Sequence, residues 1–188
     1  VPAKTLGEFI AHAKANPGKL NCGIPNPLSG FQYIQLARAT GTDLLHVPYK
    51  GEGPVMPDLL SARLHSTINS SGTATVLHKE GKLRALAVLL KNRSPLLPDV
   101  PTVDEAGVPQ VTARHWAGVF GPAKLPGELV TRLNREISTA LGRADVKEKF
   151  LSFGYAIEGS TPEELAAINR NDLVLWRRLV KEANVTLD

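Results

Sequence analysis

Apolar and polar positions alternate in short blocks over the first ninety residues, and these blocks predict strands and helices in turn. Four apolar segments have the length and composition of strands: 20–23, 44–49, 64–69 and 83–90. Helices are predicted before and between them, at 6–16, 30–40, 55–62 and 74–80. The last strand is almost wholly apolar, as expected of a strand buried on both faces. Repeated strand–loop–helix units of this length predict an α/β fold with a parallel-dominated sheet flanked by helices.

The pattern changes after residue 91. A proline-rich connection is predicted at 92–101, followed by a short helix that Thr102 caps and that ends at Gly107. The remaining elements are a strand at 112–122, helices at 126–141 and 145–153, a short strand at 155–157 and a helix from Pro162 to about Ala183. The final third of the chain is therefore predicted to be mostly helical.

The stretch 20–31 is the one that suggests a binding site. Ser29 and Gln32 have the spacing of a capping box, so Ser29 is predicted as the N-cap and Gly30 as the first residue of the helix. A helix start leaves backbone N–H groups unpaired and has a partial positive charge, which favours anionic oxygens. The expected donors are the backbone amides of Ile24, Asn26, Leu28, Ser29 and Gly30, with the Asn26 side chain and the Ser29 hydroxyl. We therefore expect this loop to hold a small carboxylate.

Two further loops are expected beside this one. The loops at 23–30, 50–54 and 69–73 each follow a predicted strand. Because the carboxyl ends of parallel strands meet at one edge of a sheet, the three loops should share that edge. A ligand would lie along it.

Composition and charge narrow the range of partners. The 188 residues are 43% apolar and 21% charged, values typical of a soluble globular protein. The net charge of +4 comes from scattered Lys and Arg, so no nucleic acid partner is expected. Cys22 is the only cysteine, which excludes an internal disulfide and any cysteine-based zinc cluster. No apolar run is long enough to cross a bilayer.

The sequence offers no catalytic constellation. The five histidines, at 12, 46, 65, 78 and 115, lack the spacing of metal ligands. Neither the H-E-x-x-H motif nor the G-x-S-x-G motif occurs. We expect no enzyme activity, no catalytic residue, no metal and no cofactor.

Six short motifs occur in a fixed order along the chain: Pro2-Ala3-Lys4-Thr5, Asn16-Pro17-Gly18, His46-Val47-Pro48-Tyr49-Lys50-Gly51, Gly81-Lys82-Leu83-Arg84-Ala85-Leu86-Ala87-Val88, Leu97-Pro98-Asp99-Val100-Pro101-Thr102-Val103 and Gly159-Ser160-Thr161-Pro162-Glu163-Glu164. Together with Trp116 and Trp176, they make the sequence similar to the Bug/TctC family over essentially its whole length. Members of that family are the extracytoplasmic solute receptors of tripartite tricarboxylate transporters.

The resemblance implies a periplasmic-binding-protein-like fold of type II, in which two lobes close on a small carboxylate. It assigns residues 1–92 to the second lobe, 93–122 to a crossover connection and strand, and 123–188 to a helical part that returns to the first lobe. Most of the family's first lobe has no counterpart in this sequence, and the start at Val1 looks like a cut within a longer parent chain or a processed terminus. The implied location is the periplasm.

Within the family, the loop that corresponds to 23–30 is rich in Gly and Ser and binds ligand mostly through backbone amides and waters. Four residues match that pattern: Gly23, Asn26, Ser29 and Gly30. Three depart from it: Pro27, Leu28 and Phe31. The departures leave the identity of the carboxylate open.

Two other groups of residues complete the expected site. We expect a second wall from Tyr49, Lys50 and Gly51, in which Lys50 either balances a second carboxylate or is a solvated lysine. Asn69 and Ser70 lie where the family often has an acidic residue that meets a ligand amine or hydroxyl. Without that charge, amino-acid ligands are less expected.

The function implied is the capture of a small organic carboxylate and its delivery to the membrane subunits of a tripartite tricarboxylate transporter. The alternatives are a ligand-sensing or interaction module, such as the effector domain of a regulator without a role in transport, and an enzyme of unknown type. The 188 residues alone are expected to bind ligand weakly, because half of the family's donors are absent. They are also expected to form a homodimer through apolar surface on the C-terminal half.

Overall fold

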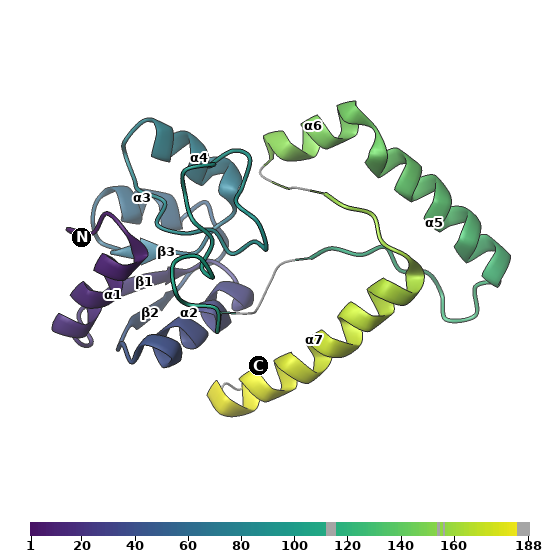
Figure 1. Ribbon diagram of the computed structural model, residues 1–188. Coiled ribbons are helices and arrows are strands. Elements are labelled where there is room, and N and C mark those ends of the chain that lie inside the picture. The colour runs from purple at the N-terminus through teal and green to yellow at the C-terminus, as the bar shows by residue number, and fades with distance from the viewer. Residues whose placement is uncertain (112–115, 154, 156, 184–188) are drawn as a thin grey trace. The chain divides into compact units, whose positions relative to one another are not determined.

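The computed structural model describes residues 1–188 except 112–115, 154, 156 and 184–188 (Figure 1). The described residues form two compact units, 1–114 and 115–188, and each is treated by itself. The lobe boundaries expected after residues 92 and 122 stay predictions.

A three-stranded parallel sheet organises the first unit (Figure 1). Its strands are β1 (Asn21–Ile24), β2 (Leu45–Pro48) and β3 (Ser66–Thr67), in the order β2-β1-β3. Gly23 of the central strand pairs with Val47 on one side and with Thr67 on the other. The parallel pairing confirms the predicted α/β class, and β2 and β3 are shorter than the sequence pattern indicates.

Four helices accompany this sheet: α1 (Leu6–Ala15), α2 (Pro27–Thr40), α3 (Val55–Leu60) and α4 (Ser71–Lys79). α1 begins as predicted after Thr5, whose side-chain oxygen accepts the Glu8 N–H at 3.1 Å. α2 ends as predicted at Gly41, which has the left-handed conformation (φ 64°) that glycine adopts without strain. Buried side chains from α1, β1, α2 and later segments form one core: Leu6, Phe9, Ala13, Leu20, Cys22, Tyr33, Leu36, Leu44, Val103, Val108 and Val111.

The prediction of a fourth strand at 83–90 is wrong. This segment makes a single parallel bridge, between Val88 and Thr102, and does not join the sheet. The Val88 N–H donates to Pro101 O at 2.8 Å, and the Val103 N–H donates to Val88 O at 3.0 Å. The ladder extends in neither direction, because Pro101 has no N–H and the Glu105 N–H is donated to Thr102 Oγ1.

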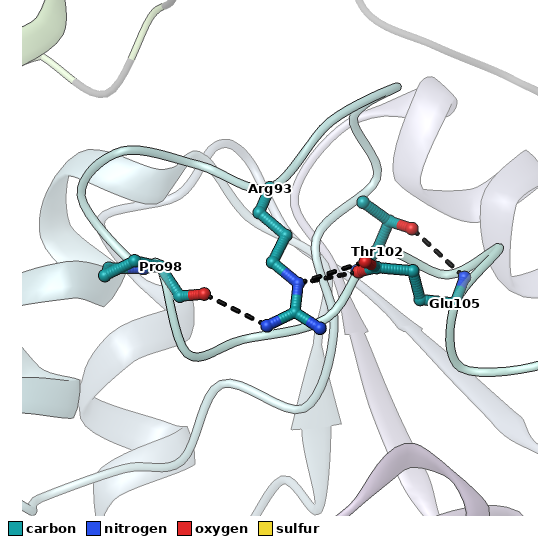
Figure 2. Close-up of polar contacts among 4 residues, drawn as sticks. All are labelled: Arg93, Pro98, Thr102 and Glu105. Atoms are coloured by element: carbon teal, nitrogen blue, oxygen red, sulfur yellow. Dashed lines mark hydrogen bonds and ion pairs between the residues drawn. The ribbon is translucent and has the colours of Figure 1, made fainter.

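The proline-rich connection is held in place by Arg93 (Figure 2). Its Nε lies 2.9 and 3.1 Å from the two carboxylate oxygens of Glu105, and its Nη1 donates to Pro98 O at 3.2 Å. Glu105 also accepts the Thr102 N–H at 2.8 Å, which completes the predicted cap. The capped segment 103–107 is a turn and not the predicted short helix. The Thr102 N–H first, and then Arg93, lower the pKa of the Glu105 carboxyl below its ordinary value.

The second unit contains three helices: α5 (Gly127–Gly142), α6 (Ala144–Ser152) and α7 (Pro162–Ala183). α7 begins as predicted at Pro162, after a capping box in which Thr161 Oγ1 accepts the Glu164 N–H and Glu164 accepts the Thr161 N–H. All three helices were predicted within a few residues of these bounds. Described residues of α5 and α6 include none that is buried.

The two strands predicted in the second unit are not formed by its described residues. Residues 116–122, 155 and 157 have no strand conformation, while 112–115 and 156 lie outside the described residues. Trp116 instead donates its indole N–H to Asp172, and Gly118 lies against Leu165, both on α7. Side-chain packing on a helix therefore replaces the expected strand pairing. These contacts support a packing role for Trp116.

Candidate functional site

The three predicted loops lie together at the carboxyl edge of the sheet. The Tyr49 N–H donates to Ile24 O at 2.9 Å, and the Gly51 N–H donates to Pro25 O at 3.2 Å. The loop after β3 is tied to the loop after β2, because the Ser70 N–H donates to a Glu52 carboxylate oxygen at 3.0 Å. This edge is the candidate site.

The start of α2 differs from the prediction. Asn26, not Ser29, is the N-cap, with extended backbone (φ −157°, ψ 164°). Pro27 is the first helical residue, and Ser29 is the third. Asparagine caps a helix as well as serine does, and proline with its fixed φ is favoured directly after the cap. The pair Asn26-Pro27 is therefore the stronger start signal, and it was overlooked in favour of Ser29 and Gln32.

This cap uses most of the donors that were expected to face a ligand. The Ser29 N–H donates to Asn26 Oδ1 at 3.0 Å, and the Asn26 N–H lies 3.4 Å from Ser29 Oγ. The Gly30 N–H donates to Asn26 O at 3.3 Å, and the buried Ser29 hydroxyl donates to the same oxygen at 2.7 Å. The expectation of unpaired Asn26, Ser29 and Gly30 amides and a free Ser29 hydrogen is wrong in this conformation. The Leu28 N–H makes no hydrogen bond to any described residue.

Gly23 and Gly30 lie close to neighbouring side chains. A Cβ atom on Gly23 would lie 2.7 Å from Leu64 Cδ1 and 3.1 Å from Val55 Cγ1. A Cβ atom on Gly30 would lie 3.3 Å from Ile24 Cγ2. Close contact of β1 with its neighbours therefore accounts for both glycines without a ligand.

The second wall is organised by Asp58 of α3. The Tyr49 hydroxyl donates to Asp58 Oδ2 at 2.6 Å, and Arg63 Nη1 donates to Asp58 Oδ1 at 3.1 Å. The hydrogen bond from Tyr49, and then the one from Arg63, lower the pKa of Asp58, while the same bond to Asp58 raises the pKa of Tyr49. The Lys50 side chain is exposed, and Gly51 has φ 98°, which favours glycine.

The third loop is bound by a residue of the second loop, Glu52, that the sequence pattern did not indicate. Glu52 binds Ser70 with both carboxylate oxygens, at 3.0 Å to the N–H and 2.5 Å to the hydroxyl. Asn69 accepts the Ser70 N–H through its own side-chain oxygen at 3.2 Å, and its side-chain nitrogen is buried without a hydrogen-bond partner. Asn69 and Ser70 are both uncharged, but Glu52 places a carboxylate beside them. The three loops were predicted to share an edge, but no spacing rule links residue 52 to residue 70.

Among the described residues, no group of three or more His, Cys, Asp or Glu side chains is arranged to hold a metal ion. No helix in the same part of the chain is long and apolar enough to span a membrane.

Residues 1–185 match the family described as tripartite tricarboxylate transporter family receptor, TctC. The UPF0065 protein in the tcbD-tcbE intergenic region of Pseudomonas sp. (strain P51) is 36% identical over 185 residues, which are 95% of this chain and 54% of that protein. The chain thus spans about half the length of this relative.

Two solved structures have the same fold. R. palustris Rpa4515 with adipate is 28% identical with a TM-score of 0.82, over 99% of this chain and 63% of that one. MatC (Rpa3494) from Rhodopseudomonas palustris with bound malate is 28% identical with a TM-score of 0.73, over 95% of this chain and 63% of that one. The family is one of solute receptors and not of enzymes. Because the family match extends over nearly every residue, the chain belongs to the TctC family of tripartite tricarboxylate transporter receptors.

Proposed function

We propose that the complete gene product captures a small organic carboxylate in the periplasm and delivers it to the membrane subunits of a tripartite tricarboxylate transporter. The observation that supports this most strongly is the family match over residues 1–185. The adipate and malate seen in two similar structures support a carboxylate as the ligand class.

We propose the carboxyl edge of the sheet as this chain's share of the binding site. The candidate residues are Gly23, Ile24, Asn26, Leu28, Ser29, Gly30, Tyr49, Lys50, Gly51, Asn69 and Ser70. The internal hydrogen bonds of the α2 cap favour direct contact through the Leu28 amide and the exposed Asn26 and Lys50 side chains. The other residues would act by shaping the edge or through waters.

Isothermal titration calorimetry of the complete gene product tests the proposal. The panel contains adipate, malate, succinate and citrate, with glucose as a ligand that has no carboxylate. Binding of at least one carboxylate with a dissociation constant in the micromolar range or below is expected. No heat with any carboxylate, or equal heat with glucose, would contradict a carboxylate receptor.

For the 188-residue chain by itself, we propose a homodimer through apolar side chains of the second unit. Val119, Phe120 and Val174 are 72%, 64% and 70% exposed, respectively. Exposed apolar side chains of this size favour burial against a second copy.

A further inference from the structure

A carboxylate of the protein itself occupies one end of the candidate site. Glu52 lies in the loop after β2, and Ser70 directly precedes α4. Both oxygens of Glu52 accept hydrogen bonds from Ser70, one from its N–H and one from its hydroxyl. Hydrogen bonds to an ionised acceptor are the stronger kind, so Glu52 is held against the loop after β3.

This contact changes what the α4 end of the site can recognise. Ser70 is a candidate site residue, and both of its donors are used by Glu52. Among the described residues, Glu52 has no ion-pair partner, so its negative charge is not neutralised by a neighbouring side chain. Asn69, the other expected contact at this end, is a neutral amide.

A ligand carboxylate at this end would meet a like charge in a partly buried setting, where repulsion is only weakly screened. An ammonium or hydroxyl group would instead find an acceptor, because a carboxylate has lone pairs beyond the two that Ser70 uses. The Glu52 charge should therefore lower the affinity for ligands with a carboxylate at the α4 end and raise it for ligands with an ammonium or hydroxyl group there.

We propose that Glu52 is a specificity-determining residue that favours a carboxylate ligand whose other end is a hydrogen-bond donor, an ammonium above all, over a dicarboxylate of the same length. This inference rests on the proposed function, since it needs a carboxylate receptor. It also restores amino-substituted carboxylates, which the sequence pattern at Asn69 and Ser70 disfavours, as the preferred ligand class.

The test compares succinate with 4-aminobutyrate, which have the same chain length and differ at one end. Both are titrated by calorimetry into the complete gene product and into two variants, Glu52→Gln and Glu80→Gln. Glutamine keeps the shape of residue 52 and removes its charge. Its one amide oxygen can still accept the Ser70 N–H, while its NH2 group donates and does not accept. Glu80→Gln is the matched control, because it removes the same charge from the exposed opposite end of α4.

The unmodified protein is expected to prefer 4-aminobutyrate by about tenfold, and Glu52→Gln to abolish or reverse that preference. Glu80→Gln should leave the ratio of the two dissociation constants within about twofold. Ser70→Ala, which keeps the Glu52 charge and removes one of its two hydrogen bonds, should retain the preference for 4-aminobutyrate.

The experiment distinguishes failure of the Glu52 proposal from failure of the receptor function. Binding of both ligands with the same ratio in the unmodified protein and in Glu52→Gln overturns the role of Glu52 and leaves the receptor function standing. Loss of the preference in Ser70→Ala but not in Glu52→Gln also overturns that role. Absence of binding by these ligands and by every member of the wider carboxylate panel overturns the receptor function, and the inference with it.

Discussion

At the scale of single residues, the candidate site is dominated by side chains that satisfy the protein's own backbone. Asn26 and Ser29 cap each other across the first turn of α2, and Glu52 binds both donors of Ser70. The protein's own hydrogen bonds hold these loops, so a ligand at the proposed site would meet a largely preset arrangement of donors and acceptors. Preset arrangements of this kind reduce the ordering cost of binding.

Replacing Asn26 tests the cap. Asn26→Ala removes the oxygen that accepts the Ser29 N–H, and the free energy of unfolding should fall by about 1 kcal/mol. Asn26→Asp keeps an acceptor at the same position and should retain stability within about 0.5 kcal/mol. Urea unfolding followed by circular dichroism measures both. Equal stability of Asn26→Ala and the unmodified protein would show that Asn26 is not the cap.

Replacing Gly23 tests its packing role. Gly23→Ala places a methyl group against Leu64 and Val55, and overpacking of this kind should lower the free energy of unfolding by about 1–3 kcal/mol. Gly53→Ala is the matched control, because a Cβ atom there would meet nothing within 4 Å. Its effect should stay within about 0.5 kcal/mol. A stable Gly23→Ala variant that fails to bind ligand would instead assign Gly23 to the site.

At the scale of elements, the connection between the sheet and the second unit is fixed by polar contacts. Arg93 joins Glu105 and Pro98, and Thr102 and Glu105 cap each other (Figure 2). These contacts hold the turn that places Val103 and Val108 in the core. A segment rich in proline thereby becomes part of the packed unit.

The contacts among Arg93, Thr102 and Glu105 predict that the stability of the fold depends on pH. The Thr102 N–H and Arg93 lower the pKa of Glu105 in the folded state, so its stabilising effect is fully present above the pKa of the unfolded chain. It is lost as the pH falls below about 4.3 and through the lower folded-state pKa. A carbon-13 NMR titration of the Glu105 carboxyl should show this lowered pKa, and Arg93→Gln should raise it only in part, because the Thr102 N–H remains. Titration of Glu105 at its ordinary pKa would contradict the contacts.

Most helix ends and the parallel pairing of β1, β2 and β3 were predictable, whereas the pairing of segment 83–90 was not. Thr5, Gly41 and Thr161 act within one turn of the chain, and the helix ends beside them were predicted correctly at 6, 40 and 162. The segment 83–90 has the composition of a buried strand, yet its pairing depends on Pro101 and Glu105, more than ten residues away. The contact between Glu52 and Ser70 was missed for the same reason, because it exists only once two loops meet.

At the scale of the whole molecule, this chain contains two units and spans 54% of a relative's length and 63% of each of two similar structures. The first unit supplies the sheet edge that we propose as a binding surface. The second unit exposes large apolar side chains, among them Val119, Phe120 and Val174.

The apolar surface predicts self-association of the 188-residue chain. Light scattering after size exclusion should give the mass of a dimer at micromolar concentration. The double variant Val119→Ser with Phe120→Ser should weaken association at least about tenfold, because two apolar contacts are lost. Leu60→Ser, at a residue 47% exposed on α3 of the first unit, is the control and should leave the mass unchanged. A monomer at every concentration would contradict the proposed dimer.

The position of the ligand can be mapped directly by nitrogen-15 NMR of the complete gene product during titration with adipate. The largest amide shift changes are expected at residues 24–30, 49–53 and 69–71, with small changes in α1 and α5. Shift changes confined to other segments would contradict a receptor site at the carboxyl edge of the sheet. The site would also be contradicted if neither saturating adipate nor another carboxylate changed the shifts of these loops.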